Sequence, residues 1–265
     1  MNPLFPARKK LLIGVVHLRP LPGAPRWSGS LADVLAAAIA DARAYERGGA
    51  DALFIENFGD IPFTKGPVGP ETIAAMAVAG RAVREAVELP LGFNVLRNDA
   101  RAGLALCAAC DGSFIRVNVH SGAMVTDQGL IEGNAFETLR YRQAVCPRVQ
   151  ILADVHVKHA VPLGSLSIAI AARDTVERGL ADALIISGTG TGVTADLAEV
   201  QRVREACPRT PLLIGSGISA ANAATYLRWT DALIVGTSLK RGGDVARPVD
   251  PARVAALKRA MGSRP

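Results

Sequence analysis

Asp154, His156 and Lys158 stand at alternate positions near the end of an apolar run over residues 150–157. In a β-strand, alternate side chains face opposite sides. The other row is apolar and is expected to face covering helices; it consists of Ile151, Ala153, Val155 and Val157. The three ionisable side chains should therefore point together into the interior. A carboxylate, an imidazole and an amine in one row are groups that general acid–base catalysis uses.

Two preceding apolar runs, residues 91–96 and 113–118, repeat this arrangement. Their inner rows hold amide and guanidinium groups, with further polar residues beyond the ends: Asn94, Arg116 and Asn118, then Asn98 and His120. A purely structural interior would carry apolar residues here, because a buried charge is unfavourable unless it is paired. We therefore expect a ligand site on this wall. The alternative is that Arg116, Asp154 and Lys158 form a neutral internal network without chemistry.

Glu56 ends another apolar run, residues 51–56, and completes the candidate catalytic set. In the enzyme interpretation Asp154 or Glu56 is the general base, and His156 or Lys158 is the acid or an electrostatic partner. Asn94, Arg116 and Asn118 would then orient substrate hydroxyls. Lys158 is alternatively the amine of a Schiff base, although the sequence gives no reason for a lowered pKa.

All four histidines lie at or just beyond the ends of expected strands: His17, His120, His156 and His159. For each one alone, a structural hydrogen bond is the simpler interpretation, but their joint placement favours the site. A divalent metal held by some of His17, Glu56, Asp154 and His156 is a further alternative. No H-x-H or H-E-x-x-H motif supports it, and no organic-cofactor motif is present.

Two glycine-containing segments follow the last two apolar runs. They are Gly215, Ser216 and Gly217, and then Gly236, Thr237 and Ser238. In a (β/α)8 barrel the loops after strands seven and eight usually hold a phosphate, whose charge the backbone N–H groups can bind. The pattern predicts a phosphate-binding cup, although glycines also serve tight turns without any ligand.

Residues 187–195, with the sequence SGTGTGVTA, form a third glycine-rich segment. Residues 190–195 fit G-x-G-x-x-A, but the segment follows the sixth apolar run and the next run ends without an acid. A dinucleotide fingerprint needs both features, and G-K-[ST] for a nucleotide P-loop is also missing. We interpret Gly188 and Gly190 as part of a mobile loop that contacts substrate.

Strand-like and helix-like segments alternate along the whole chain. The expected strands are residues 11–17, 51–56, 91–96, 113–118, 150–157, 182–187, 212–215 and 232–236. The expected helices are 31–47, 71–87, 99–109, 135–145, 168–178, 195–206, 220–227 and 251–260. Eight such units predict a parallel (β/α)8 barrel of the phosphate-binding type, spanning residues 1–265 as one domain. An open doubly wound sheet is the alternative.

Asp51, Asp182 and Asp231 each open a strand within a weak repeat, A/T-D-A-L-[FI]-[IV]. Such repetition is what a barrel of similar units would show. The loops that follow strands are long and rich in glycine and proline, whereas those that precede strands are short. The long ones cover residues 18–30, 57–69, 119–134 and 159–167. Long loops after strands mark the functional rim of this fold.

Composition excludes several classes of protein. Of the 265 residues, 49% are hydrophobic, but no apolar run reaches the length of a membrane span and residues 1–10 lack a signal-peptide core. We therefore expect a cytoplasmic location. The net charge of +6 is scattered over helices, so nucleic-acid binding is not expected, and an anionic small ligand fits the charge equally well. The sequence leaves a homo-oligomer open. Cys107 and Cys110 share one helix face and should pack as small hydrophobes rather than bind zinc.

Five fragments together resemble the BtpA/SgcQ family, over about residues 14–254. They are GFNVLRND (92–99), FIRVNVH (114–120), TDQG (126–129), LADVHVKH (152–159) and VGTSLK (235–240). The resemblance implies a TIM barrel of the phosphate-binding kind. One branch of the family is tied to photosystem I biogenesis at thylakoid membranes, and another lies among sugar-metabolism genes. It implies no particular reaction.

Two functions follow as hypotheses. The first is an enzyme, a phosphosugar-type isomerase, lyase or hydrolase, acting on a phosphorylated sugar or nucleotide-like metabolite at the C-terminal face of the barrel. The second is a non-enzymatic assembly factor of the photosystem I type, which needs no polar interior but needs an exposed apolar patch. The proline-rich loop at residues 18–27 is the only such patch that the sequence offers.

Overall fold

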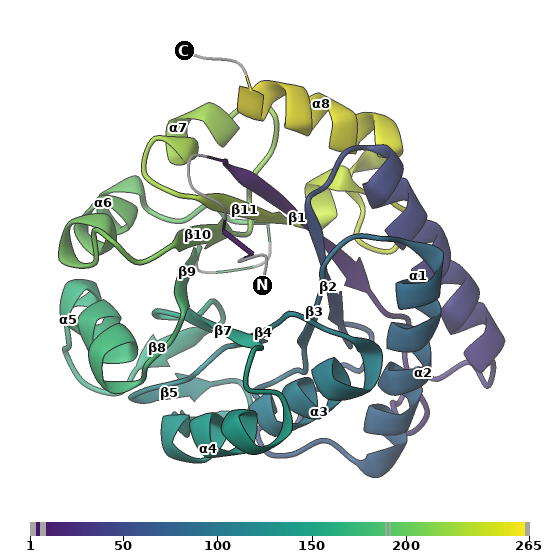
Figure 1. Cartoon of the computed structure of the whole chain (residues 1–265), viewed down its shortest axis with the longest axis horizontal. Coiled ribbons are helices and arrows are strands. Elements are labelled where there is room, and N and C mark those ends of the chain that lie inside the picture. Colours follow the sequence, from purple (N-terminus) through teal and green to yellow (C-terminus); the bar gives the residue numbers. More distant parts are fainter. Residues whose placement is uncertain (1–3, 6–8, 189, 191, 263–265) are drawn as a thin grey trace.

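Eight parallel strands close into a barrel in the computed structural model, which describes residues 4–5, 9–188, 190 and 192–262. The barrel strands are β1 (Leu11–His17), β2 (Ala52–Glu56), β3 (Leu91–Asn94), β4 (Phe114–Val117), β7 (Gln150–Asp154), β9 (Ala183–Ser187), β10 (Leu212–Gly215) and β11 (Ala232–Val235). Figure 1 shows them as a ring. Because β1 pairs with both β2 and β11, the ring has no open edge. The predicted barrel is confirmed, and the open sheet is excluded.

Helices surround this ring and alternate with its strands (Figure 1). They are α1 (Leu31–Arg47), α2 (Pro70–Ala86), α3 (Ala100–Cys110), α4 (Ala135–Val145), α5 (Ile168–Arg173), α6 (Leu197–Ala206), α7 (Ala223–Leu227) and α8 (Pro251–Gly262). A π-helical turn, Asp174–Arg178, continues α5. Side-chain caps begin several of them; the Ser30 hydroxyl, for example, accepts a hydrogen bond from the Asp33 N–H at 3.2 Å.

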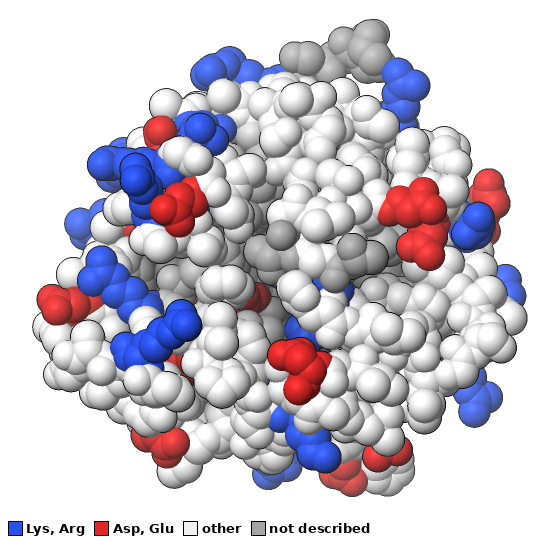
Figure 2. All heavy atoms as spheres, turned by 180° about the vertical axis from the view of Figure 1, so that it is seen from behind, with Lys and Arg blue, Asp and Glu red and all other residues white. Residues whose placement is uncertain are grey.

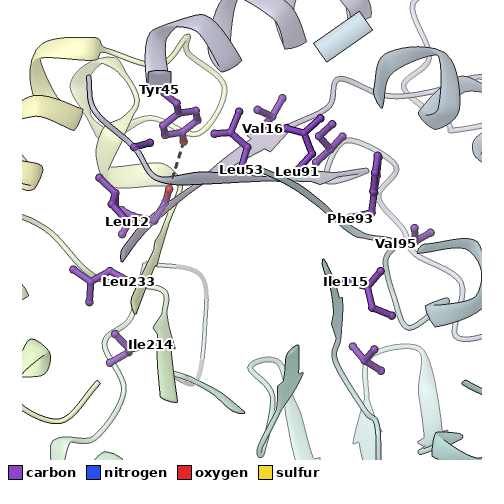
Figure 3. Packing of buried hydrophobic residues seen from close by; sticks show 14 of the residues in the cluster. Leu12, Val16, Tyr45, Leu53, Leu91, Phe93, Val95, Ile115, Ile214 and Leu233 are labelled. Carbon is purple, nitrogen blue, oxygen red and sulfur yellow. Dashed lines mark hydrogen bonds between the residues drawn. The ribbon is translucent and has the colours of Figure 1, made fainter. Parts of the chain in front are cut away.

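Period-two alternation sorts the strand side chains into two cores. The outer core packs beneath the helices, and Figure 3 shows part of it around Tyr45, whose hydroxyl donates to the Val15 carbonyl at 3.1 Å. The inner core fills the barrel, where the rings of Phe54 and Phe114 meet edge to face at 4.8 Å. Leu4 and Phe5 pack against this inner core. The filled barrel leaves the carboxyl ends of the strands as the place for a site.

The repeated aspartates join neighbouring strands at their starting ends. A carboxylate oxygen of Asp51 accepts from the Leu12 N–H at 2.8 Å, that of Asp182 from Ile151 at 2.7 Å, and that of Asp231 from Leu212 at 3.0 Å. Each aspartate also forms ion pairs: Asp51 with Lys9 and Lys258, Asp182 with Arg142, and Asp231 with Arg204 and Lys10. The sequence repeat is therefore a structural device at the end of the barrel away from the site.

The predicted loops at 119–134 and 159–167 are wrong in part, because they contain a small antiparallel sheet. It consists of β5 (Ala123–Thr126), β6 (Gly129–Glu132) and β8 (Ala160–Pro162), in the order β6, β5, β8. Its inner side is apolar: Met124 and Ile131 of the sheet pack with Val119 and Val157 of the barrel rim. The outer row had predicted that Val157 packs beneath the helices. It packs beneath this small sheet instead.

Cys107 and Cys110 are buried free thiols on the inner face of α3. The Cys107 thiol donates to the Phe114 carbonyl at 3.3 Å and the Cys110 thiol to Ala77 at 3.4 Å. Burial raises the pKa of both thiols, which keeps them protonated and unreactive. The packing interpretation of this pair is confirmed.

Candidate functional site

A cavity of about 330 Å³ opens at the carboxyl ends of the strands. It joins the polar wall to both predicted phosphate loops; the lining includes His17, Glu56, Phe58, Arg116, Lys158, Gly192, Ser216, Gly217, Ser219, Gly236, Thr237, Ser238 and Arg253. Figure 2 shows the molecule from the end opposite to that of Figure 1, with a hollow near the centre and charges of both signs interspersed around it. A cavity of this volume suits a small metabolite.

Glu56 lies on the wall of the cavity, between two neutral partners. Asn94 on β3 donates to Glu56 Oε2 at 2.5 Å, and His17 Nε2 on β1 lies 4.0 Å from Oε1. The register pairs His17 with Glu56 and Glu56 with Asn94, so three adjacent strands bring these residues together. Only one carboxylate oxygen accepts a strong hydrogen bond, which leaves the other available for proton transfer.

Arg116 and Asp154 form a buried ion pair on neighbouring strands. Arg116 Nε and Nη2 donate to the two carboxylate oxygens of Asp154, each at 2.8 Å, and Asn118 Nδ2 donates to Oδ2 at 3.1 Å. This bidentate geometry is the strongest form of the interaction. Asp154 has the predicted lumenal position, but it lies behind Arg116 and does not line the cavity. Arg116 does.

Lys158 extends into the cavity from the segment after β7. Its backbone is fixed on both sides: the N–H donates to the Ser187 hydroxyl at 3.1 Å, and Arg97 Nη2 donates to its carbonyl at 2.6 Å. Its ammonium group has no hydrogen bond or ion pair with any described residue. Burial lowers the pKa of Lys158, and Arg116 and Arg97 lower it further, whereas Glu56 and Asp154 oppose the shift.

The two glycine loops also line the cavity, and the loop after β11 lies next to His17. Ser216 and Gly217 adopt φ values of 71° and 65°, and a Cβ on Gly217 would lie 2.4 Å from the Thr194 nitrogen. A Cβ on Gly236 would lie 2.6 Å from the His17 ring. Among the described residues, the N–H groups of 217, 218, 237 and 238 donate to no backbone acceptor. Free N–H groups at glycine turns are the donors that a phosphate requires.

The glycine-rich loop after β9 borders the same cavity only through Gly192. Gly188 lies directly against residues 193–194, since a Cβ there would meet the Val193 carbonyl oxygen at 2.2 Å. Gly190 lies beside His159. Thr189 and Thr191, which belong to the predicted substrate loop, lie outside the described residues. The substrate-binding role of Gly188 and Gly190 stays a prediction, as does that of Gly215, which ends β10 outside the cavity lining.

The predicted lumenal placement is wrong for two histidines. β7 ends at Asp154, and His156 adopts φ 53°, so the alternation of the strand no longer applies. His156 does not line the cavity; burial lowers its pKa, and Glu199 on α6 opposes that shift. His120 is a structural histidine, with Nε2 at 2.7 Å from the Gly179 carbonyl oxygen.

The residues considered for a divalent metal do not form a ligand set. Arg116 occupies both oxygens of Asp154, and His156 lies away from His17 and Glu56. Across the part of the chain that the structure describes, no group of three His, Cys, Asp or Glu side chains is arranged to hold a metal ion.

Four residues of the site were not found from the sequence: Arg97, Phe58, Ser219 and Arg253. Arg97 is buried, and its Nε has no partner among the described residues. The Phe58 ring packs against the His17 ring, with centroids 4.6 Å apart and planes tilted by 42°. Arg253 donates to the Ser238 carbonyl at 3.0 Å and places a positive charge beside the glycine loops. It lies in the first turn of α8, the helix after the last strand.

His17 should make folding stability depend on pH. Burial lowers its pKa from 6.5 to about 4, although Glu56 raises it. The unfolded chain therefore binds more protons between these values, and stability falls as pH falls from 6.5 towards 4. We expect the loss to be about 3 kcal/mol at the acid end.

The check is urea unfolding of the wild type and His17→Gln at several pH values. The free energy of unfolding of the glutamine variant should fall less steeply with decreasing pH, because the variant lacks the His17 contribution while the other histidines and the carboxylates titrate equally in both proteins. Equal slopes would contradict the assignment.

Together the closed ring of parallel strands, its alternating helices and a polar cavity at the carboxyl ends define a TIM barrel. Among solved structures, it is similar to tryptophan synthase from Mycobacterium tuberculosis (TM-score 0.64, 19% identity, 97% of this chain and 94% of that chain). It is also similar to phosphoribosyl anthranilate isomerase from Thermus thermophilus (TM-score 0.58, 16% identity, 95% and 98%). At these identities the likeness shows the fold.

The sequence profile of the BtpA family matches residues 8–263, and the chain belongs to that family. It is 46% identical over 250 residues to the photosystem I biogenesis protein BtpA of Synechocystis sp., covering 94% of this chain and 87% of that protein. It is 35% identical over 251 residues to the sgc region protein SgcQ of Escherichia coli, covering 93% and 92%. The resemblance noted from the sequence is thereby confirmed.

Proposed function

We propose that this protein is a cytoplasmic enzyme acting on a small phosphorylated metabolite, a sugar phosphate or a nucleotide-like compound. The phosphate binds the glycine loops after β10 and β11, with Arg253 beside it. Glu56 and Lys158 exchange protons with the rest of the substrate, and Arg116 orients the hydroxyl groups of the substrate. Across the described residues no helix is both long and apolar enough to cross a membrane.

One observation carries the proposal: a single cavity contains both the unpaired N–H groups of the glycine loops and the ionisable pair Glu56 and Lys158. Three buried polar atoms of the surrounding wall have no partner among the described residues: His17 Nδ1, Asn94 Oδ1 and Asn118 Oδ1. Buried polar atoms are normally hydrogen-bonded. Of these three residues only His17 lines the cavity, so a ligand hydroxyl is a suitable partner for its Nδ1. A barrel without a ligand site would need neither these free N–H groups beside ionisable side chains nor these unpartnered polar atoms.

A second candidate is a non-enzymatic role in biogenesis, of the kind named for the photosystem I biogenesis protein BtpA of Synechocystis. The predicted docking loop at 18–27 is wrong in part, because Leu18 and Leu21 are buried in the core. Exposed apolar side chains lie instead on and beside the small sheet, where Val161 is 67% and Leu163 61% exposed. A role through this surface would not require the phosphate loops, so the experiment below separates the two candidates.

Gly217→Val should abolish phosphate binding. Its Cβ would collide with the backbone of residues 193–194, so the glycine loop must move and its N–H groups must turn away. We expect phosphorylated ligands to bind at least about tenfold more weakly, or about 1.4 kcal/mol. Calorimetric titration with inorganic phosphate and a panel of sugar phosphates measures this loss.

Gly122→Val is the matched control. Gly122 has a similar φ of 69°, but a Cβ there would meet nothing within 4 Å. Both variants carry the same backbone strain, and only Gly217→Val should lose phosphate. Wild-type affinity of Gly217→Val for phosphorylated ligands would place the phosphate elsewhere and remove the main support for the enzyme.

A further inference from the structure

Among the described residues, no carboxylate forms a hydrogen bond or ion pair with the Lys158 ammonium group, unlike the carboxylates beside Arg116 and Lys240. Arg116 is neutralised by two hydrogen bonds to Asp154, and Lys240 is neutralised by Asp41 at 2.5 Å. Asn94 and His17 flank Glu56, which is the carboxylate that acts most on Lys158 but does not form an ion pair with it. The Lys158 amine is therefore held in the cavity without a salt bridge.

The surroundings of Lys158 favour its uncharged form. Burial lowers the pKa of the amine, and the guanidinium groups of Arg116 and Arg97 act in the same direction. The backbone contacts to Ser187 and Arg97 fix the root of the side chain, so the amine reaches one part of the cavity. A positioned amine without a paired carboxylate and with a lowered pKa is more readily deprotonated to the nucleophilic form, whereas a lysine that only balanced charge would be paired with a carboxylate.

We infer that Lys158 forms an imine with the carbonyl group of a phosphorylated aldehyde or ketone. This rests on the proposed function, because the phosphate held by the glycine loops would place the carbonyl in the same cavity. The nitrogen lone pair attacks the carbonyl carbon and a C–N bond forms. The two amine protons leave with the carbonyl oxygen as water, and Glu56 carries a proton from nitrogen to oxygen. No oxidant or reductant is consumed. The inference narrows the substrates to phosphorylated carbonyl compounds.

Borohydride trapping tests this chemistry, because it reduces an imine to a stable amine. The full-length protein is incubated with glyceraldehyde 3-phosphate and borohydride, digested, and mapped by mass spectrometry. We expect the adduct at Lys158 well before it forms at Lys65, an exposed lysine that serves as the internal reference. Lys158→Arg keeps the charge but cannot form an imine, and it should lose this early adduct. Inorganic phosphate should slow trapping at Lys158 and leave Lys65 unaffected.

Two further measurements keep the inference separate from the proposed function. If phosphate binds the wild type but Lys158 is trapped no faster than Lys65, the imine is overturned and the phosphate site stands. If Lys158 is trapped equally by unphosphorylated glyceraldehyde, and phosphate does not compete, the amine is confirmed and the phosphate site fails. Circular dichroism of Lys158→Arg, together with its affinity for phosphate, establishes that the variant is folded.

Discussion

Asp154→Asn is expected to reduce the free energy of unfolding by about 3–5 kcal/mol, the usual loss when one partner of a buried ion pair is removed. The carboxylate accepts three hydrogen bonds from Arg116 and Asn118, and the side chains of Arg116 and Asp154 are only 6% and 0% exposed. Asparagine leaves the guanidinium without a counter-charge and turns one acceptor into a donor. Chemical denaturation of the purified variant measures the loss.

Two controls make this result specific. Asp111→Asn removes the carboxylate of an exposed pair with Arg81 and should leave stability unchanged, because surface pairs are screened by water. The double replacement of Arg116 by Met and Asp154 by Leu removes both charges and should recover much of the stability. If Asp154→Asn folds as stably as the wild type but loses turnover, Asp154 is the base, and its pairing with Arg116 is secondary.

The barrel and much of its interior could be predicted because strand alternation is a regular signal. Along β4 and β7, side chains alternate between the outer and the inner row as the sequence predicts, up to Asp154, where β7 ends. Beyond that residue the prediction fails for His156, whose positive φ turns the chain out of the strand. Lys158 lies in the cavity, as predicted, but contacts of its backbone with Ser187 and Arg97 position it there. The strand alternation on which the prediction was based does not extend to this residue.

The loops were less predictable because long-range contacts decide their structure. β5 and β6 have only four residues each, and β8, which completes their sheet, follows about thirty residues later. No local pattern links these segments. Arg97 was missed for a similar reason: it follows β3 outside any strand period, and its contact with the Lys158 carbonyl joins residues 61 positions apart. The glycine loops after β10 and β11 could be located because fold position and glycine content coincide there, and their binding of phosphate stays a prediction.

Glu56→Gln is expected to lower turnover by about 10²–10⁴-fold, the usual contribution of a general acid or base. Glutamine keeps the size of the side chain, and its carbonyl oxygen can still accept the hydrogen bond from Asn94. The variant loses the group that carries a proton between the Lys158 amine and the substrate oxygen. Steady-state rates on the best phosphorylated ligand measure the loss, and borohydride trapping at Lys158 should slow in parallel.

Phosphate affinity should stay unchanged in Glu56→Gln, because the proposed phosphate donors are backbone N–H groups of the glycine loops and Glu56 is not one of them. Glu85→Gln, which alters a carboxylate paired with Arg81 on the surface, controls for the chemical change alone. Should turnover survive in Glu56→Gln while stability falls, Glu56 only balances the charge of Lys158. In that case proton transfer must use another group of the same cavity, and His17, neutral above a pKa of about 4, is the one beside it.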